Sequence, residues 1–129
     1  MFRAACWSAA AARELTTIGD ASPRDLAVFK DQVQAGEWQL WEIVVSGDRK
    51  GFLIWSVEQE GKEFSLVVNA AAARPVAGVD VTAAMLAAFR ALAQETGAYA
   101  VRCWTARAGL KRKLERAGCK ARYVMELEI

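Results

Sequence analysis

Three apolar segments with a period of two, joined by short turns, occupy the middle of this chain and limit its fold most strongly. Residues 38–45 read WQLWEIVV, residues 51–59 read GFLIWSVEQ and residues 64–69 read FSLVVN. Such alternation is typical of strands, and the intervening sequences SGDRKG and QEGKE favour hairpin turns. Both faces of the segments are largely apolar. We therefore expect an antiparallel meander that is covered on both sides.

Helical patterns flank the meander. Before it, the sequence SPRD at 22–25 carries an N-cap, a proline at the first helical position and a carboxylate at N3, and apolar residues recur at helical spacing until Gly36. After an irregular stretch at 70–80, apolar residues recur every three or four positions from Val81 up to Gly97. The sequence therefore predicts two helices, one on each side of the meander.

The two ends of the chain complete the order of elements. Residues 98–104 predict a strand, residues 105–118 a helix and residues 119–129 a closing strand. The first twenty residues are harder to interpret, because MFRAAC fits a short strand while WSAAAAREL has the alanine content of a helix. A sheet that receives crossover helices closes on itself most simply as an α/β (α+β) fold. We expect one domain over residues 1–129, with a mixed central sheet, an antiparallel meander and helices on both faces.

Composition limits the chemistry. The chain of 129 residues is 54% hydrophobic, carries a formal net charge of +2 and contains no histidine. That absence excludes Ser-His-Asp and Cys-His nucleophile sites and a histidine general base, and it disfavours a metal site. The three cysteines, Cys6, Cys103 and Cys119, are odd in number and widely spaced, which fits reduced, buried thiols. No long apolar run is present, so we expect a cytoplasmic protein without a membrane segment.

The order of elements resembles the GNAT superfamily of acyl-CoA N-acyltransferases. The tail TARAGLKRKLERAGCKARYVMELEI is similar to the helix, glycine and strand that close that fold. The chain also resembles short GNAT-like proteins carried by bacteriophages. The resemblance implies an N-acetyltransferase that uses acetyl-CoA or CoA and an amine substrate, in the host cytoplasm or the virion if phage-encoded. It implies no metal.

The resemblance also implies where a cofactor would bind. In GNAT enzymes the fourth strand and the start of the following helix hold the cofactor, through a Gln/Arg-x-x-Gly-x-Gly/Ala loop whose amides bind the pyrophosphate. Neither of two alignments of residues 74–82 restores both glycines, and Asp80 is better explained as a helix N-cap. The cofactor-binding candidates are Val68, Asn69, Ala70, Arg74, Gly78, Val79, Thr82, Arg107 and Lys111.

The acid and base of the GNAT reaction are only partly represented. The family's acid tyrosine would fall four residues before Gly118, where this chain has Leu114; Tyr99 or Tyr123 is an alternative donor or a packed aromatic. Glu42, between aromatic and apolar neighbours, is the candidate catalytic base, with an exposed strand carboxylate as the other interpretation.

Two features leave a second function class open. Residues 107–122 carry seven basic residues against one acid, which fits CoA phosphates, an acidic partner or a solvated helix face, with nucleic acid the weakest option. Five tryptophans exceed what a core of this size needs and indicate a substrate cleft or a partner surface. The sequence thus supports either an acyltransferase or a catalytically inactive GNAT-fold protein that binds a protein partner, in an assembly or as a homo-oligomer.

Overall fold

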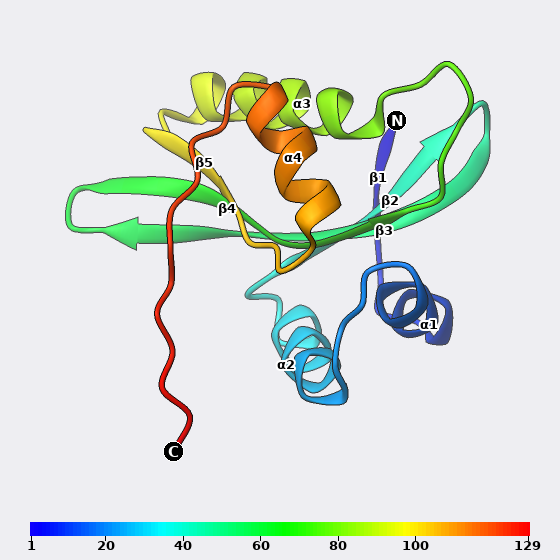
Figure 1. The fold of residues 1–129 in the computed structure, drawn as a ribbon, viewed down its shortest axis with the longest axis horizontal. Coiled ribbons are helices and arrows are strands. Elements are labelled where there is room, and N and C mark those ends of the chain that lie inside the picture. Colours follow the sequence, from blue (N-terminus) through cyan, green and yellow to red (C-terminus); the bar gives the residue numbers. More distant parts are fainter.

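The alternating segments form the strands of one five-stranded sheet in the computed structural model, which describes residues 1–129 (Figure 1). Helices lie on both faces of this sheet. In chain order the elements are β1 (Phe2–Ala5), α1 (Ala9–Thr17), α2 (Pro23–Gln34), β2 (Gln39–Val45), β3 (Asp48–Glu60), β4 (Glu63–Ala73), α3 (Val81–Thr96), β5 (Ala100–Cys103) and α4 (Ala108–Arg116).

The strands lie side by side in the order β1-β2-β3-β4-β5. The first four pair antiparallel, as short connections dictate, whereas β5 is parallel to β4 and is reached through α3. Chain order and strand order therefore coincide. The expected α/β fold, with a mixed sheet, an antiparallel meander and helices on both faces, is confirmed.

Each face of the sheet has its own apolar core. Helices α3 and α4 cover one face, and α1 and α2 cover the other (Figure 1). On the α3 side the buried cluster comprises Ile43, Leu53, Leu66, Val68, Met85, Phe89, Ala93 and Leu114. On the α1 side it comprises Ala11, Leu15, Leu40, Phe52, Ile54 and Ala72. Alternate residues of one strand enter opposite clusters, which explains why both faces of the meander are apolar.

The helix signals of the sequence act as expected. The hydroxyl of Ser22 accepts from the amide of Asp25 and the carboxylate of Asp25 accepts from the amide of Ser22, so α2 begins in a capping box. Helix α3 begins at the N-cap Asp80, whose side chain accepts from the amide of Ala83, and it ends at Gly97 with a φ of 87°. The interpretation of Asp80 as a cap is confirmed.

Three expectations are corrected or refined. The stretch at 70–80 is not irregular throughout, because β4 continues to Ala73 by pairing with β3. The alanines there have low strand propensity, so the partner strand decides their conformation. The first twenty residues form both a strand and a helix. The closing strand at 119–129 is wrong: these residues form no strand, and residues 120–129 make no backbone hydrogen bond within the chain. No helix has both the length and the apolar character needed to cross a bilayer.

Candidate functional site between β4 and β5

A bulge in β4 separates the last two strands of the sheet. Ile54 of β3 pairs with Ala70 and Trp55 pairs with Val68, so Asn69 has no partner across the β3–β4 ladder. An extra residue of this kind bends its strand and ends regular pairing. On the other edge, β4 pairs with β5 only from Ser65 to Val68. The two strands diverge at the bulge. Beyond it, β4 continues to Ala73 with no partner strand on the edge that faces β5.

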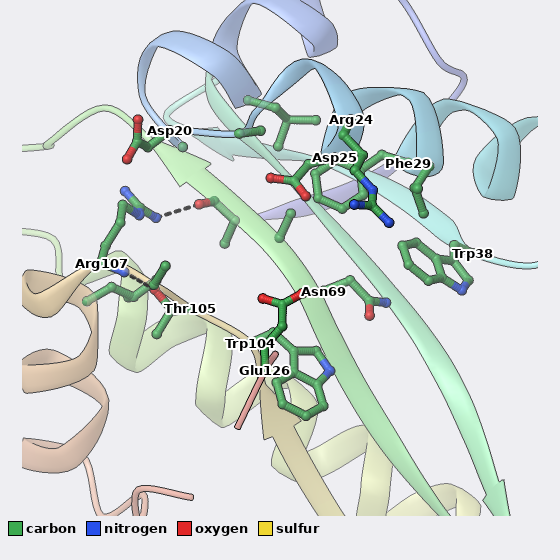
Figure 2. Close-up of a pocket in the computed structure, with 18 residues that line it drawn as sticks. Asp20, Arg24, Asp25, Phe29, Trp38, Asn69, Trp104, Thr105, Arg107 and Glu126 are labelled. Atoms are coloured by element: carbon green, nitrogen blue, oxygen red, sulfur yellow. Dashed lines mark hydrogen bonds between the residues drawn. The ribbon is translucent and has the colours of Figure 1, made fainter. Parts of the chain in front are cut away.

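The divergence opens a cavity of about 600 Å³. Its walls are the α1–α2 connection, the first turns of α2, the bulged part of β4 and the β5–α4 connection (Figure 2). Among the lining residues are Asp20, Arg24, Asp25, Phe29, Trp38, Asn69, Ala70, Ala71, Trp104, Thr105, Arg107, Leu110 and Glu126. Such a volume, placed where two parallel strands splay apart, is in the range of small-molecule sites.

Arg107 ties the two walls of the cavity together. Its Nη2 donates to the carbonyl of Ala71 on β4 at 2.6 Å (Figure 2). Its Nη1 donates to the carbonyl of Ile18, which follows α1, at 3.1 Å. The Ala71 carbonyl belongs to the strand edge that β5 leaves unpaired. The guanidinium thus occupies part of the hydrogen-bonding edge that the splay exposes. It is also the N-cap residue of α4, which has no side-chain cap, so the first amides of that helix stay available.

Aromatic and charged groups line the rest of the cavity. Trp38 packs against Phe29 with ring centroids 6.1 Å apart, and Trp104 keeps 48% of its surface exposed on the opposite wall. Asp25 is engaged in the α2 capping box. Asp20 and Glu126 make no side-chain hydrogen bond and no ion pair within the chain. These two carboxylates are therefore free to meet a cationic group.

Of the predicted cofactor residues, Asn69, Ala70 and Arg107 line this cavity. Val68 lies immediately beside it and accepts the amide of Trp104 at 3.0 Å, which is the last backbone link between β4 and the segment after β5. The side-chain amide of Asn69 donates to the hydroxyl of Ser56 at 2.9 Å. That bond fixes the bulged residue on β3. The structure thus brings four of the candidates together at the divergence of the strands.

The other cofactor candidates lie elsewhere. Gly78, Val79 and Thr82 are at the start of α3 and contribute nothing to the cavity wall. The Asp80 carboxylate occupies the amide that an anion would use there. Arg74 points to α1, where it pairs with Glu14 at 2.6 Å. Lys111 pairs with Glu115 on the exposed side of α4.

The predicted acid–base residues are also outside the cavity. Glu42 on β2 pairs with Arg3 of β1. Leu114 is buried under α3, and Tyr123, which lies after α4 near the C-terminus, is 83% exposed. Tyr99 precedes β5, at the end remote from Trp104, and its hydroxyl donates to Glu60. That hydrogen bond raises the pKa of Tyr99, which makes the phenol a poorer proton donor.

Several lining residues escaped the sequence argument. Asp20 and Thr105 come from two connections that are distant in sequence, and Arg24 comes from the first turn of α2; none of them was singled out as a site residue. Trp104 is one of the five tryptophans that the sequence analysis assigned to a cleft or a partner surface. The sequence held one local signal, an aspartate at position 20 before the start of α2. In the structure Asp20 adopts a φ of 59°, a conformation that aspartate tolerates better than most residues. No signal linked that turn to the segment after β5. No group of His, Cys, Asp or Glu side chains suited to a metal ion is present.

Comparison with known proteins places the fold. No protein-family model matches the chain, and no curated protein matches it significantly. Solved structures match over its whole length. A ribosomal-protein-alanine N-acetyltransferase from Brucella melitensis biovar Abortus 2308 aligns with a TM-score of 0.70 at 15% identity, covering 100% of this chain and 99% of that one.

Two eukaryotic proteins give similar alignments. An acetyltransferase from Trypanosoma brucei has a TM-score of 0.66 at 12% identity and full coverage of both chains. Glucosamine-6-phosphate N-acetyltransferase from Arabidopsis thaliana has a TM-score of 0.60 at 10% identity, with 100% and 98% covered. Identities this low establish architecture only. The chain therefore has a GNAT-like fold, shared from end to end with solved acetyltransferases.

Proposed function

We propose that this protein binds an acyl-CoA in the cavity between β4 and β5 and transfers the acyl group to an amine. The observation that carries the proposal is the Asn69 bulge, which turns a continuous sheet into a splayed one and exposes the β4 edge to a cavity of about 600 Å³. A purely structural sheet gains nothing from lost backbone pairing in its interior. The shared architecture of solved acetyltransferases is consistent with this use of the splay.

The residues present fit part of an acyl-CoA. The edge of β4 that β5 leaves unpaired offers backbone groups to an extended amide chain, much as a strand would, except for the Ala71 carbonyl that Arg107 occupies. Arg107 and Arg24 supply positive charge to phosphates, supported by the uncapped start of α4. The start of α3 does not fit, because Asp80 caps it with a carboxylate. We therefore assign Val68, Asn69, Ala70 and Arg107 to the cofactor and leave Arg74, Gly78, Val79, Thr82 and Lys111 out.

Acyl-CoA, when bound, supplies an activated thioester. The reaction forms a C–N bond as the C–S bond breaks, and the amine must lose a proton. Asp20 is the lining carboxylate that is free of other partners on the α1–α2 wall, so we assign it to hold the substrate ammonium and accept its proton. This assignment replaces Glu42, which is engaged with Arg3. Trp38, Phe29 and Trp104 would exclude water and pack against the acceptor.

The test is a titration of the full ¹⁵N-labelled chain with CoA and with acetyl-CoA, followed by amide NMR. Binding as proposed shifts the amides at 69–71 and 104–107 and leaves those of β1 unchanged. An Arg107→Ala variant is expected to weaken binding roughly tenfold, which corresponds to ~1.4 kcal/mol, whereas Arg112→Ala on the exposed side of α4 serves as the matched control. Absence of shifts at millimolar CoA contradicts the proposal.

An acetylation assay with a panel of amines then tests transfer, and Asp20→Asn should lower kcat with less effect on CoA binding.

A second candidate is a catalytically inactive protein that keeps the fold and binds a protein partner, as the resemblance to phage-carried proteins implies. The observations that favour it are the carboxylate cap at α3 and the buried Leu114 at the position of the family's acid tyrosine. The same titration separates the two. An Asp80→Gly variant that gains CoA binding, where the native chain has none, would identify a site closed by that side chain.

A further inference from the structure

A second cavity, of about 360 Å³, lies where the end of β1 and the link to α1 meet the end of α2 and the start of β2. Its lining includes Cys6, Trp7, Gln34, Trp38 and Gln39. Trp38 also lines the cavity between β4 and β5, so one indole is a wall that both cavities share. The volume of the second cavity is at the lower end of the range of small-molecule sites.

No charged residue lines the second cavity. The cavity between β4 and β5 differs in this respect, because Asp20, Arg24 and Arg107 belong to its walls. A charged ligand would lose water in the second cavity without gaining a counter-charge, which is costly. The second cavity therefore favours a neutral ligand.

The polar side chains of the second cavity have no partner within the chain. The carboxamides of Gln34 and Gln39 make no hydrogen bond there, whereas the carboxamide of Gln59 donates to two backbone carbonyls. The indole N–H groups of Trp7 and Trp38 likewise donate to no group of the chain. Each carboxamide has an acceptor oxygen and two N–H donors. The lining thus offers both donors and acceptors to a ligand.

Two indoles supply the aromatic surface of the second cavity. Trp7 immediately precedes the N-cap of α1, Trp38 immediately precedes β2, and both are half-buried. Phe29 supports Trp38, with ring centroids 6.1 Å apart. Indoles stack on planar heteroaromatic rings whatever the identity of the ring. A planar ring that bears a neutral hydrogen-bonding group therefore fits both the indoles and the carboxamides.

We propose that the second cavity binds a neutral heteroaromatic ring that carries an amide group. Trp7 and Trp38 contact the ring, and the carboxamides of Gln34 and Gln39 bond to its amide. Because Trp38 also lines the cavity between β4 and β5, a bound ring contacts a residue of both cavities. The proposal is independent of acyl-CoA binding.

Amide and indole NMR of the full ¹⁵N-labelled chain, titrated with nicotinamide, tests the site. The indole signals of Trp7 and Trp38 and the side-chain amide signals of Gln34 and Gln39 should shift, while the indole of Trp55, which packs under α3, should not. Nicotinate has the same ring with a carboxylate, and cyclohexanecarboxamide has the same amide on a saturated ring. Each should bind at least tenfold more weakly. Equal binding of either compound, or no shift at tens of millimolar nicotinamide, overturns the proposal.

Variants locate the ring. Trp7→Leu should weaken nicotinamide binding at least tenfold, whereas Trp104→Leu changes a tryptophan that lines only the cavity between β4 and β5 and should leave binding unchanged. Gln39 is exposed, so Gln39→Leu keeps the fold and should still weaken binding. Nicotinamide should also slow the labelling of Cys6 by Ellman's reagent. Sensitivity to Trp104→Leu without sensitivity to Gln39→Leu would place the ring in the other cavity and refute the proposal.

Discussion

The sequence and the structure assign different roles to Arg74, and replacing this residue tests which one it has. The sequence suggests a cofactor ligand, whereas the structure makes Arg74 a partner of the Glu14 carboxylate at 2.6 Å. Glu14 is 4% exposed, and Arg49 approaches its other oxygen at 3.3 Å. The carboxylate lies between α1 and the end of β4, so its charge is compensated only by these two arginines. We expect Arg74→Ala to destabilise the fold and to leave CoA binding unchanged.

The magnitude follows from the burial of the two partners. Breaking a fully buried pair costs ~3–5 kcal/mol and breaking an exposed one ~0–1 kcal/mol. Glu14 is buried, but the Arg74 side chain is 54% exposed and Arg49 stays in place. A loss of about 2 kcal/mol in the free energy of unfolding is therefore expected. With an unfolding entropy of ~2.1 cal/mol/K per residue over 129 residues, this lowers Tm by about 7 °C.

Urea unfolding, monitored through tryptophan fluorescence, measures the change at constant m-value. The matched control is Arg3→Ala, which removes the partner of Glu42 from a pair whose arginine side chain is 63% exposed, and it should cost less than ~1 kcal/mol. Adding Glu14→Gln to Arg74→Ala should recover part of the loss, because no buried charge then lacks compensation. If Arg74→Ala is no more destabilising than Arg3→Ala and weakens CoA binding, the structural account of Arg74 is refuted.

Three further predictions follow from local structure. Asp80→Ala removes the N-cap of α3 and should cost ~1 kcal/mol in urea unfolding, with Asp80→Asn close to native. Gly51→Ala places a Cβ 1.9 Å from the Ala72 carbonyl oxygen, so β3 and β4 must separate, and we expect a loss of ~3 kcal/mol or more and little folded protein on expression; native-like stability would contradict the register. Burial raises the pKa of the Cys103 thiol to about 12, so at pH 8 Ellman's reagent should label exposed Cys6 rapidly and Cys103 only after unfolding. Because the folded pKa lies above the unfolded one, the stability from the neutral thiol is complete below about pH 9 and declines as pH rises toward 12, which alkaline unfolding measures.

The candidate site was only partly readable from the sequence. Asn69, Ala70 and Arg107 were named in advance because the family resemblance points to the fourth strand and the basic helix, and all three line the cavity. The cavity itself depends on a one-residue bulge, and nothing in the run VVNAAAA marks which residue is left unpaired. The register with β3 decides that. Asp20, Arg24 and Trp104 joined the site because the α1–α2 connection and the start of α2 meet the β5–α4 connection there, although the two regions are distant in sequence.

The sequence by itself determined the local elements of this protein. Period-two alternation, the capping signals at Ser22 and Asp80 and the stop at Gly97 act over a few residues, and each produced the element it predicts. The tertiary structure decided whatever depends on a distant partner. Four alanines became strand because β3 offers them hydrogen bonds, whereas residues 123–129 alternate like a strand but form no backbone hydrogen bond within the chain. The physical reason is that a helix satisfies its backbone internally, while a strand exists only where another strand completes it.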